Sequence, residues 1–178
     1  MDDNPQLRNI LKVFAHYGFK KASMDDLARA AEVSRQTLYS RHKTKEGVLD
    51  WAVAGFFSDV QRDAITALQN PRASVERSLL DAFDRWSGDH VSLLQEAPHG
   101  SEVLDMGTES LARTGVDYQE GFDEALVAFL RDRDLCRTQK QAADKAYLLM
   151  MASKGLLIKS ADGEAFRIGM KRVIRAAL

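Results

Sequence analysis

The stretch SMDDLARAAEVSRQTLYSRHKTK, residues 23–45, decides the fold. Apolar residues in its first half recur at the spacing of one helix face, and Ser23 stands before them with Asp26 in the capping-box position. Residues 31–34 form a tight turn, after which Ser34 can cap a second helix. Two short helices joined by such a turn predict a helix-turn-helix.

The second of these helices is almost entirely polar. It reads RQTLYSRHK over residues 35–43, and Leu38 is its clear candidate for burial, together with Val33 in the turn before it. A cation, an amide, a hydroxyl and a phenol in succession suit a helix that reads base edges, because Arg can pair with guanine and Gln with adenine. A solvated helix face is the alternative interpretation. The two caps, the basic surroundings and the apolar helix in front favour DNA reading.

Charge is distributed unevenly around this motif. The whole chain carries 25 Lys and Arg against 26 Asp and Glu, a formal net charge of −1. Residues 8–45 have a balance of +6, whereas residues 51–178 have a balance of −3. A basic end on an acidic body predicts that this end meets a polyanion.

The rest of the 178 residues predicts an all-α fold, because apolar residues recur at three and four and only three prolines interrupt them. A first helix is expected from near Pro5 to Gly18, and a long one from a Thr44 cap to Asn70-Pro71. Further helices are expected at residues 73–87, 118–133, 139–158 and 163–177. Glycines and Pro98 break residues 88–115, which predicts short helices joined by turns.

Several classes of protein are disfavoured. No phosphate-binding loop, nucleophile elbow or His pair at ligand spacing is present, so no catalytic residue, enzyme activity or cofactor is expected. His90 and His99, with Glu96 and Glu102 nearby, could form a metal site, but ordinary polar surface is the favoured interpretation, and no metal is expected. Cys136 is either a thiol sensor or, as we favour, a small apolar filler at a helix end.

The compartment is also predicted. The single cysteine excludes an internal disulfide framework, and the acidic start at residues 1–4 has no apolar run behind it. The longest uncharged apolar stretches are too short to span a bilayer. We therefore expect a cytoplasmic protein with no membrane partner.

An ordered series of motifs runs through residues 10–54: ILKVF at 10–14, GF at 18–19, SMDDLA at 23–28, Ala31, VS at 33–34, TLY at 37–39 and KE at 45–46. This series closely resembles the TetR family of bacterial one-component transcriptional regulators. Two positions depart from the family pattern. Glu32 occupies a turn position usually taken by Gly, where positive φ disfavours other residues, and Arg41-His42 replaces an aromatic residue.

The resemblance implies the roles of individual residues. It places Arg35, Gln36, Thr37 and Tyr39 in the major groove as base-reading residues, and Ser23, Tyr39, Lys43 and Lys45 against phosphates. Elementary chemistry agrees for two of them, because Ser23 and Lys45 stand at helix N-termini, which attract anions.

The resemblance also implies two domains with different functions. A three-helix helix-turn-helix domain at residues 1–50 would bind a double-stranded DNA operator, and residues 51–178 would form a helical ligand-binding and dimerisation domain. We expect a homodimer through residues 139–177, because residues 147–151 are apolar around the whole helix and Phe166, Met170, Val173, Ile174 and Ala177 follow at helical spacing. An unknown small-molecule effector, mostly apolar, would release a repressor from its operator.

The candidate lining of the effector pocket is aromatic, Met-rich or weakly polar: Phe83, Trp86, His90, His99, Met106, Tyr118, Phe129 and Met150. Core packing is the alternative role for each of these residues. Two other functions stay open: a DNA-binding structural or division-control protein on the same scaffold without a small ligand, and a helical enzyme that happens to contain a helix-turn-helix.

Overall fold

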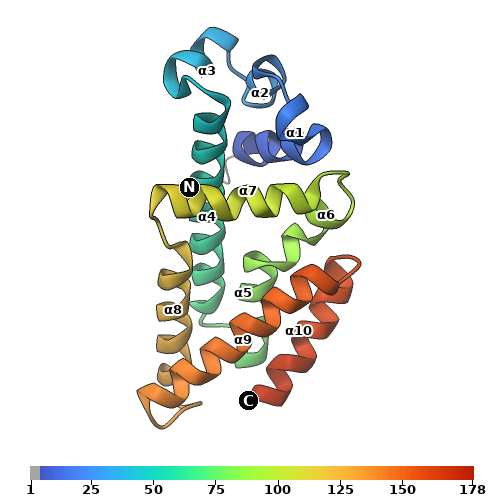
Figure 1. Cartoon of the computed structure of the whole chain (residues 1–178). Coiled ribbons are helices and arrows are strands. Elements are labelled where there is room, and N and C mark those ends of the chain that lie inside the picture. The colour runs from blue at the N-terminus through green and yellow to red at the C-terminus, as the bar shows by residue number, and fades with distance from the viewer. Residues whose placement is uncertain (1–4) are drawn as a thin grey trace. The chain divides into compact units, whose positions relative to one another are not determined.

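The computed structural model describes residues 5–178, and the acidic start at residues 1–4 lies outside the described part. The all-α prediction is confirmed, since residues 5–178 form helices, turns and loops without a strand (Figure 1). The helices are α1 (Pro5–Lys21), α2 (Met24–Ala30), α3 (Arg35–His42), α4 (Lys45–Leu68), α5 (Val75–Trp86), the 3₁₀ turn η1 (Gly88–His90), α6 (Val91–Gln95), α7 (Gly100–Thr114), α8 (Tyr118–Asp132), α9 (Gln139–Lys159) and α10 (Gly163–Ala177). Among them, none combines the length and the hydropathy that crossing a membrane requires.

The chain forms two compact units. The first contains the residues up to Asp59 together with Leu93–Val116, and the second contains Val60–Ser92 and Asp117–Leu178. The predicted boundary at residue 50 differs from this division, because residues 93–116 join the N-terminal unit and α4 belongs to both. The functional assignment of residues 1–50 and 51–178 stays a prediction.

The first unit has its own apolar core. Helices α1 to α3 contribute Ile10, Phe14, Leu27 and Leu38, and α4 contributes Val48, all of which are fully buried. Helix α7 adds Val103 and Met106. The predicted stop of α1 is confirmed in its geometry, because Gly18 has φ +74° and interrupts the helical backbone before Lys21. A Cβ atom at Gly18 would also lie 3.0 Å from the His99 ring, so glycine is required both for the turn and for the close approach of α7.

Helix α7 corrects one expectation about residues 88–115. The segments η1 and α6 are short, as predicted, but Gly100–Thr114 is one continuous helix that passes through Gly107. A single interior glycine costs only about 1 kcal/mol of helix stability. Burial of Val103 and Met106 in the core of the first unit offsets that cost. The helix ends at Gly115, which has the left-handed conformation expected of a helix terminus.

Polar contacts join α7 to α1 and α4 at its two ends. At its start, the amide of His99 donates to the Ala15 carbonyl (2.8 Å) and the amide of Phe19 donates to Glu102 Oε1 (3.1 Å). Near its end, Ser110 Oγ donates to Asp50 Oδ1 (2.7 Å), and Arg113 forms an ion pair with the same carboxylate oxygen. α7 is therefore held to the helices that precede and follow the helix-turn-helix.

The second unit is built from α5, η1, α8, α9 and α10, with the C-terminal part of α4 and the first two residues of α6. Its core contains the fully buried aromatic residues Phe83, Phe122 and Phe166 and the buried free thiol Cys136, which agrees with the apolar-filler interpretation. One expectation about α10 is wrong. Phe166, Met170 and Ile174 are fully buried within their own unit, so they are not available to a partner.

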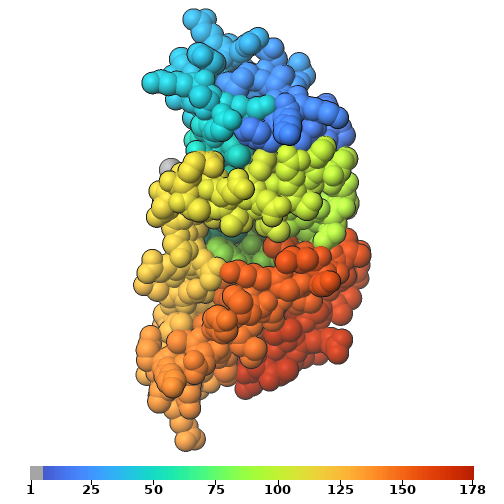
Figure 2. Space-filling view, viewed as in Figure 1, coloured from blue at the N-terminus to red at the C-terminus, as the bar shows by residue number. Residues whose placement is uncertain are grey.

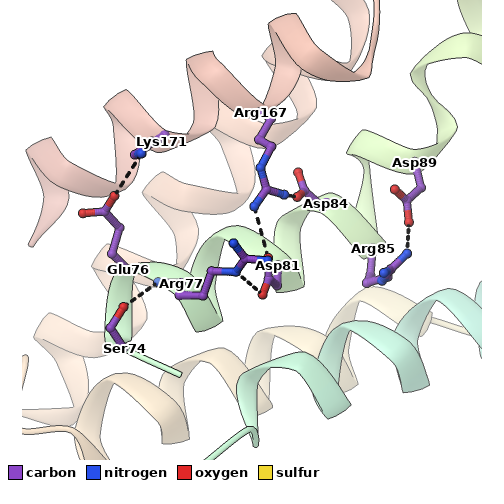
Figure 3. Close-up of polar contacts among 9 residues, drawn as sticks. All are labelled: Ser74, Glu76, Arg77, Asp81, Asp84, Arg85, Asp89, Arg167 and Lys171. Carbon is purple, nitrogen blue, oxygen red and sulfur yellow. Dashed lines mark hydrogen bonds and ion pairs between the residues drawn. The ribbon is translucent and has the colours of Figure 1, made fainter. Parts of the chain in front are cut away.

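Ion pairs cover the exposed side of the contact between α5 and α10 (Figure 3). Arg167 pairs with both Asp81 and Asp84, and Lys171 lies 3.8 Å from Glu76. Because α10 supplies the cations and α5 the carboxylates, these pairs fix the two helices side by side over the buried phenylalanines.

The contacts of Asp50 generate a pH-dependent prediction. Burial by itself raises the pKa of the Asp50 carboxyl, but the hydrogen bonds from Arg113 and Ser110 outweigh this effect and lower the pKa below its ordinary value. The carboxylate therefore stabilises the fold above its unfolded pKa, near about 4, and this stabilisation is lost as the pH falls through the folded value.

Asp50→Asn should lower the free energy of unfolding at pH 7 by about 1 kcal/mol, because the charge-assisted bonds are weakened. The difference from the wild-type protein should shrink as the pH falls below about 4. Chemical denaturation over a pH series measures both effects, with Asp105→Asn on the exposed face of α7 as the control. A loss of stability that is the same at every pH would contradict the assigned role of the carboxylate.

Candidate nucleic-acid interface

Helices α2 and α3 form the helix-turn-helix (Figure 1), and the two predicted caps fix it. The Ser23 hydroxyl accepts from the Asp26 amide (3.2 Å), and an Asp26 carboxylate oxygen accepts from the Ser23 amide (3.2 Å), which completes the capping box. Hydrogen bonds from Ser23 lower the pKa of Asp26. The Ser34 hydroxyl accepts from the Thr37 amide (3.0 Å) at the start of α3. Glu32 in the turn has φ +55°, so the prediction of positive φ at a non-glycine residue is confirmed.

Helix α3 presents one polar face to solvent. Leu38 is fully buried, as predicted, whereas Val33 is only half-buried against the same core. Of the predicted base-reading residues, Arg35, Gln36 and Tyr39 are exposed and Thr37 is half-buried. Because Leu38 anchors the opposite side, the side chains that could read bases project away from the core.

The predicted base-reading residues differ in how they are held. Arg35 Nη1 lies 3.1 Å from Asp25 Oδ2, and the hydroxyls of Thr37 and Ser34 are 2.8 Å apart. The phenol of Tyr39 is 59% exposed. Two of the four residues are therefore restrained by neighbours on the helix-turn-helix before any contact with DNA.

The predicted phosphate-binding residues also fall into two groups. Lys43 ends α3 with φ +59° and is exposed, as is Tyr39. Lys45 Nζ donates to the carbonyls of Ala22 (2.9 Å) and Lys20 (3.2 Å), and the Ser23 hydroxyl donates to Asp26 (2.5 Å). In the free protein, Lys45 and Ser23 therefore stabilise the turn and the cap.

Lys45 has a structural role that its sequence position did not indicate. Its ammonium lies 4.7 Å from the centre of the Phe19 ring, and its two hydrogen bonds satisfy carbonyls around the end of α1. A cation at this place is favourable because carbonyls at a helix C-terminus lack partners within the helix. Lys45 thus joins the start of α4 to the turn between α1 and α2.

His42 lies where Arg41-His42 replaces an aromatic residue of the family pattern, and its imidazole ring is stacked. The ring of His42 lies 4.6 Å from the ring of Trp51, with an angle of 20° between their planes. Burial, together with the charge of Arg41, lowers the pKa of His42, which keeps the ring neutral near pH 7. The imidazole thus supplies the flat contact between α3 and α4 that an aromatic side chain would make.

The candidate pocket residues are divided between the two units. His99 and Met106 belong to the first unit, and the second unit contains Phe83, Trp86, His90, Tyr118, Phe129 and Met150. Phe83, Phe129 and Met150 are buried members of the core, and Trp86 stacks on Phe122 with ring centres 4.6 Å apart. These contacts are those of the core-packing alternative, so a role in ligand binding stays a prediction.

The possible metal ligands make other contacts. His99 Nδ1 lies 2.8 Å from Glu102 Oε2, and His90 Nε2 lies 3.0 Å from the Arg85 carbonyl. Within residues 5–178, no group of three or more His, Cys, Asp or Glu side chains is arranged to hold a metal ion.

The roles of Asp25, Asp50 and Trp51 were not predicted from the sequence. Asp25 stands ten residues from Arg35, and Asp50 stands 63 residues from Arg113, so neither pairing follows from helical spacing. The opposite charges of Asp25 and Arg35 on neighbouring helices of the motif were the one available signal.

Comparisons with known proteins agree with this geometry. Residues 7–51 match the model of the family described as bacterial regulatory proteins, tetR family. No curated protein sequence matches the chain.

Solved structures with similar folds span nearly the whole chain. A transcriptional regulator from Rhodococcus sp. Rha1 is 17% identical with a TM-score of 0.71, covering 98% of this chain and 94% of its own. The TetR-family regulator PfmR from Thermus thermophilus is 17% identical with a TM-score of 0.62, covering 96% and 97%. A TetR variant from Acinetobacter baumannii AYE, solved in complex with minocycline, is 16% identical with a TM-score of 0.54, covering 99% and 96%.

The helix-turn-helix with its two caps, the family match over residues 7–51 and the fold shared along the chain lead to one conclusion. Residues 7–51 are similar to the N-terminal domain of the tetR family of bacterial regulatory proteins, and the chain as a whole has a fold like those of solved regulators of that family.

Proposed function

We propose that the protein is a transcriptional regulator that binds an operator in double-stranded DNA as a homodimer. The observation that carries this proposal is the polar face of α3. Its exposed residues Arg35, Gln36 and Tyr39 stand opposite the buried Leu38, on a helix fixed by the Ser34 cap. Such a face suits the major groove, where amide and guanidinium groups distinguish base pairs.

The charge of this region supports the proposal. Residues 8–45 have a balance of +6, and Lys43 extends from the end of α3 into solvent. Lysines beside a recognition helix neutralise phosphates, which fixes the register of the helix in the groove without reading sequence. Tyr39 can add a hydroxyl to the same backbone contacts, while Lys45 and Ser23 would first have to share or release their present partners.

The proposed dimer interface lies on α9 and α10, within residues 139–177. Figure 2 shows the continuous surface that these helices, in orange and red, form on one face of their unit. Tyr147 and Leu148 on α9 are 67% and 54% exposed, and Ile168 on α10 is 58% exposed. Large apolar side chains that stay exposed on a helix are candidates for burial against a partner, and two helices from each subunit can form a four-helix interface across a two-fold axis.

The proposed regulation is release of a repressor by a small molecule. A dimer matches its operator when the two recognition helices fit major grooves about 34–36 Å apart. A ligand can change that fit only if it binds better to one spacing than to the other, and a coupling of about 1–3 kcal/mol is typical. The minocycline complex of the Acinetobacter baumannii protein shows that a chain of this fold can hold a small ligand.

Gln36→Ala should relax the preference at one base position and cost about 1–3 kcal/mol on the preferred sequence, because the amide that reads the base is lost. Lys43→Ala should instead weaken binding to all sequences and flatten the slope of log K against log salt by about one unit. Selection from a random duplex library, followed by titration at several salt concentrations, measures both effects. If Gln36→Ala weakened binding to preferred and random DNA equally, the assignment of Gln36 as a base-reading residue would be wrong.

Tyr147→Glu should convert the dimer to a single chain of 19.9 kDa and reduce operator affinity, because a charge is placed on the proposed interface. Tyr17→Glu is the matched control, since Tyr17 is 46% exposed on α1 and should leave the dimer intact. Sedimentation equilibrium at micromolar concentration gives the mass of each variant. A wild-type protein that is already a single chain would exclude this arrangement.

A panel of uncharged aromatic and acyl compounds should contain an effector that raises the melting temperature by about 5–10 °C. That shift corresponds to the roughly 2.7 kcal/mol expected at about one hundred times the dissociation constant. The same compound should release the protein from the DNA that was selected from the random duplex library. If no compound stabilises a protein that binds its operator, the alternative of a structural or division-control DNA-binding protein without a small ligand is favoured.

A further inference from the structure

An ion pair links the two helices of the helix-turn-helix on their exposed side. Arg35, the first residue of α3, approaches Asp25 in the first turn of α2 with Nη1 and Oδ2 3.1 Å apart. The side chains are 66% and 57% exposed, so solvent screens the pair and its contribution to stability is small. The main effect of the ion pair is that it restrains the guanidinium of Arg35.

The geometry leaves part of the guanidinium available. Asp25 engages Arg35 through one nitrogen, Nη1, and the guanidinium carries five N–H donors in a fixed plane. The Nε and Nη2 groups can therefore still form the two parallel hydrogen bonds that guanine O6 and N7 accept. Asp25 can hold the plane of the guanidinium in place while the other edge of the guanidinium reads a base.

The neighbouring carboxylate cannot take this role. Asp26 bonds the amide and hydroxyl of Ser23 in the capping box and lies 3.5 Å from Arg29. Asp25 has no part in the capping box, and its carboxylate instead accepts from Arg35. The two adjacent acids of α2 therefore have separate functions, one in the cap and one toward α3.

We propose that Asp25 is a specificity-determining residue that acts by positioning Arg35. The inference rests on the proposed function, since it assigns a base-reading role to Arg35. On a sequence with guanine at the correct place, Arg35 keeps its bond to Asp25 and reads the base with its free edge. On other sequences a phosphate attracts the guanidinium, but Arg35 must leave Asp25 and the unpaired carboxylate then faces a polyanion. Asp25 thereby weakens binding to incorrect sequences more than binding to the correct one.

The test compares full-length wild type, Asp25→Asn and Glu32→Gln on a random duplex library. Glu32 is an exposed carboxylate in the turn of the same motif, so Glu32→Gln removes the same charge away from Arg35. Asp25→Asn should lose about tenfold in preference for guanine at the position that Arg35→Ala also relaxes, while its affinity for random duplex rises severalfold. Glu32→Gln should keep the wild-type preference. A thermal melt of each variant checks that the fold is retained.

A double-mutant cycle separates positioning from charge. In the Arg35→Ala background, Asp25→Asn should leave the base preference unchanged, because the side chain that it positions is absent. The inference is overturned if Asp25→Asn keeps the wild-type preference, if Glu32→Gln changes it equally, or if Asp25→Asn acts without Arg35. A wild-type protein without any preferred sequence would overturn the proposed function as well, which distinguishes the two failures.

Discussion

The burial of Leu38 is the constraint on which the exposed polar face of α3 depends. Helix α3 has eight residues, a length that is not stable alone in water, and within it Leu38 is the one fully buried side chain. The Ser34 cap and the stacking of His42 on Trp51 hold the two ends of the helix around this anchor. Rotation about the helix axis is thereby fixed, and the polar residues on either side of Leu38 have to face outward.

Local signals predicted the helices well. Caps act over three residues, so Ser23 and Ser34 could be assigned from the sequence, and the range Gly163–Ala177 was predicted as the structure has it. The continuity of α7 was missed because glycine weakens a helix by an amount that tertiary packing can offset. Helical periodicity also located the apolar face of α10, but it could not distinguish the core of the same unit from the surface of a partner.

The candidate site was only partly predictable for a related reason. The residue types of Arg35 and Gln36 indicate which groups their side chains can bind, but not which contacts restrain these side chains in the free protein. The partners of Lys45 are backbone carbonyls, which every residue has, so the sequence does not indicate them. The partners of Asp50 lie far from it along the chain. A pocket requires a cavity shape, and aromatic and Met residues look the same in a sequence whether they line a cavity or fill a core.

The contacts around Phe19 have a consequence for how the protein fluctuates. Its ring stacks on the buried Phe14 and lies beneath the Lys45 ammonium of α4, and its amide is bonded to Glu102 of α7. Opening this turn would break contacts with α4 and α7 at once, and both helices contribute to the core of the same unit. Helices α2 and α3 are therefore not an independently fraying end of the chain. Amide hydrogen exchange in the turn would therefore follow a cooperative opening that includes the start of α4, and not the rapid local opening typical of a surface turn.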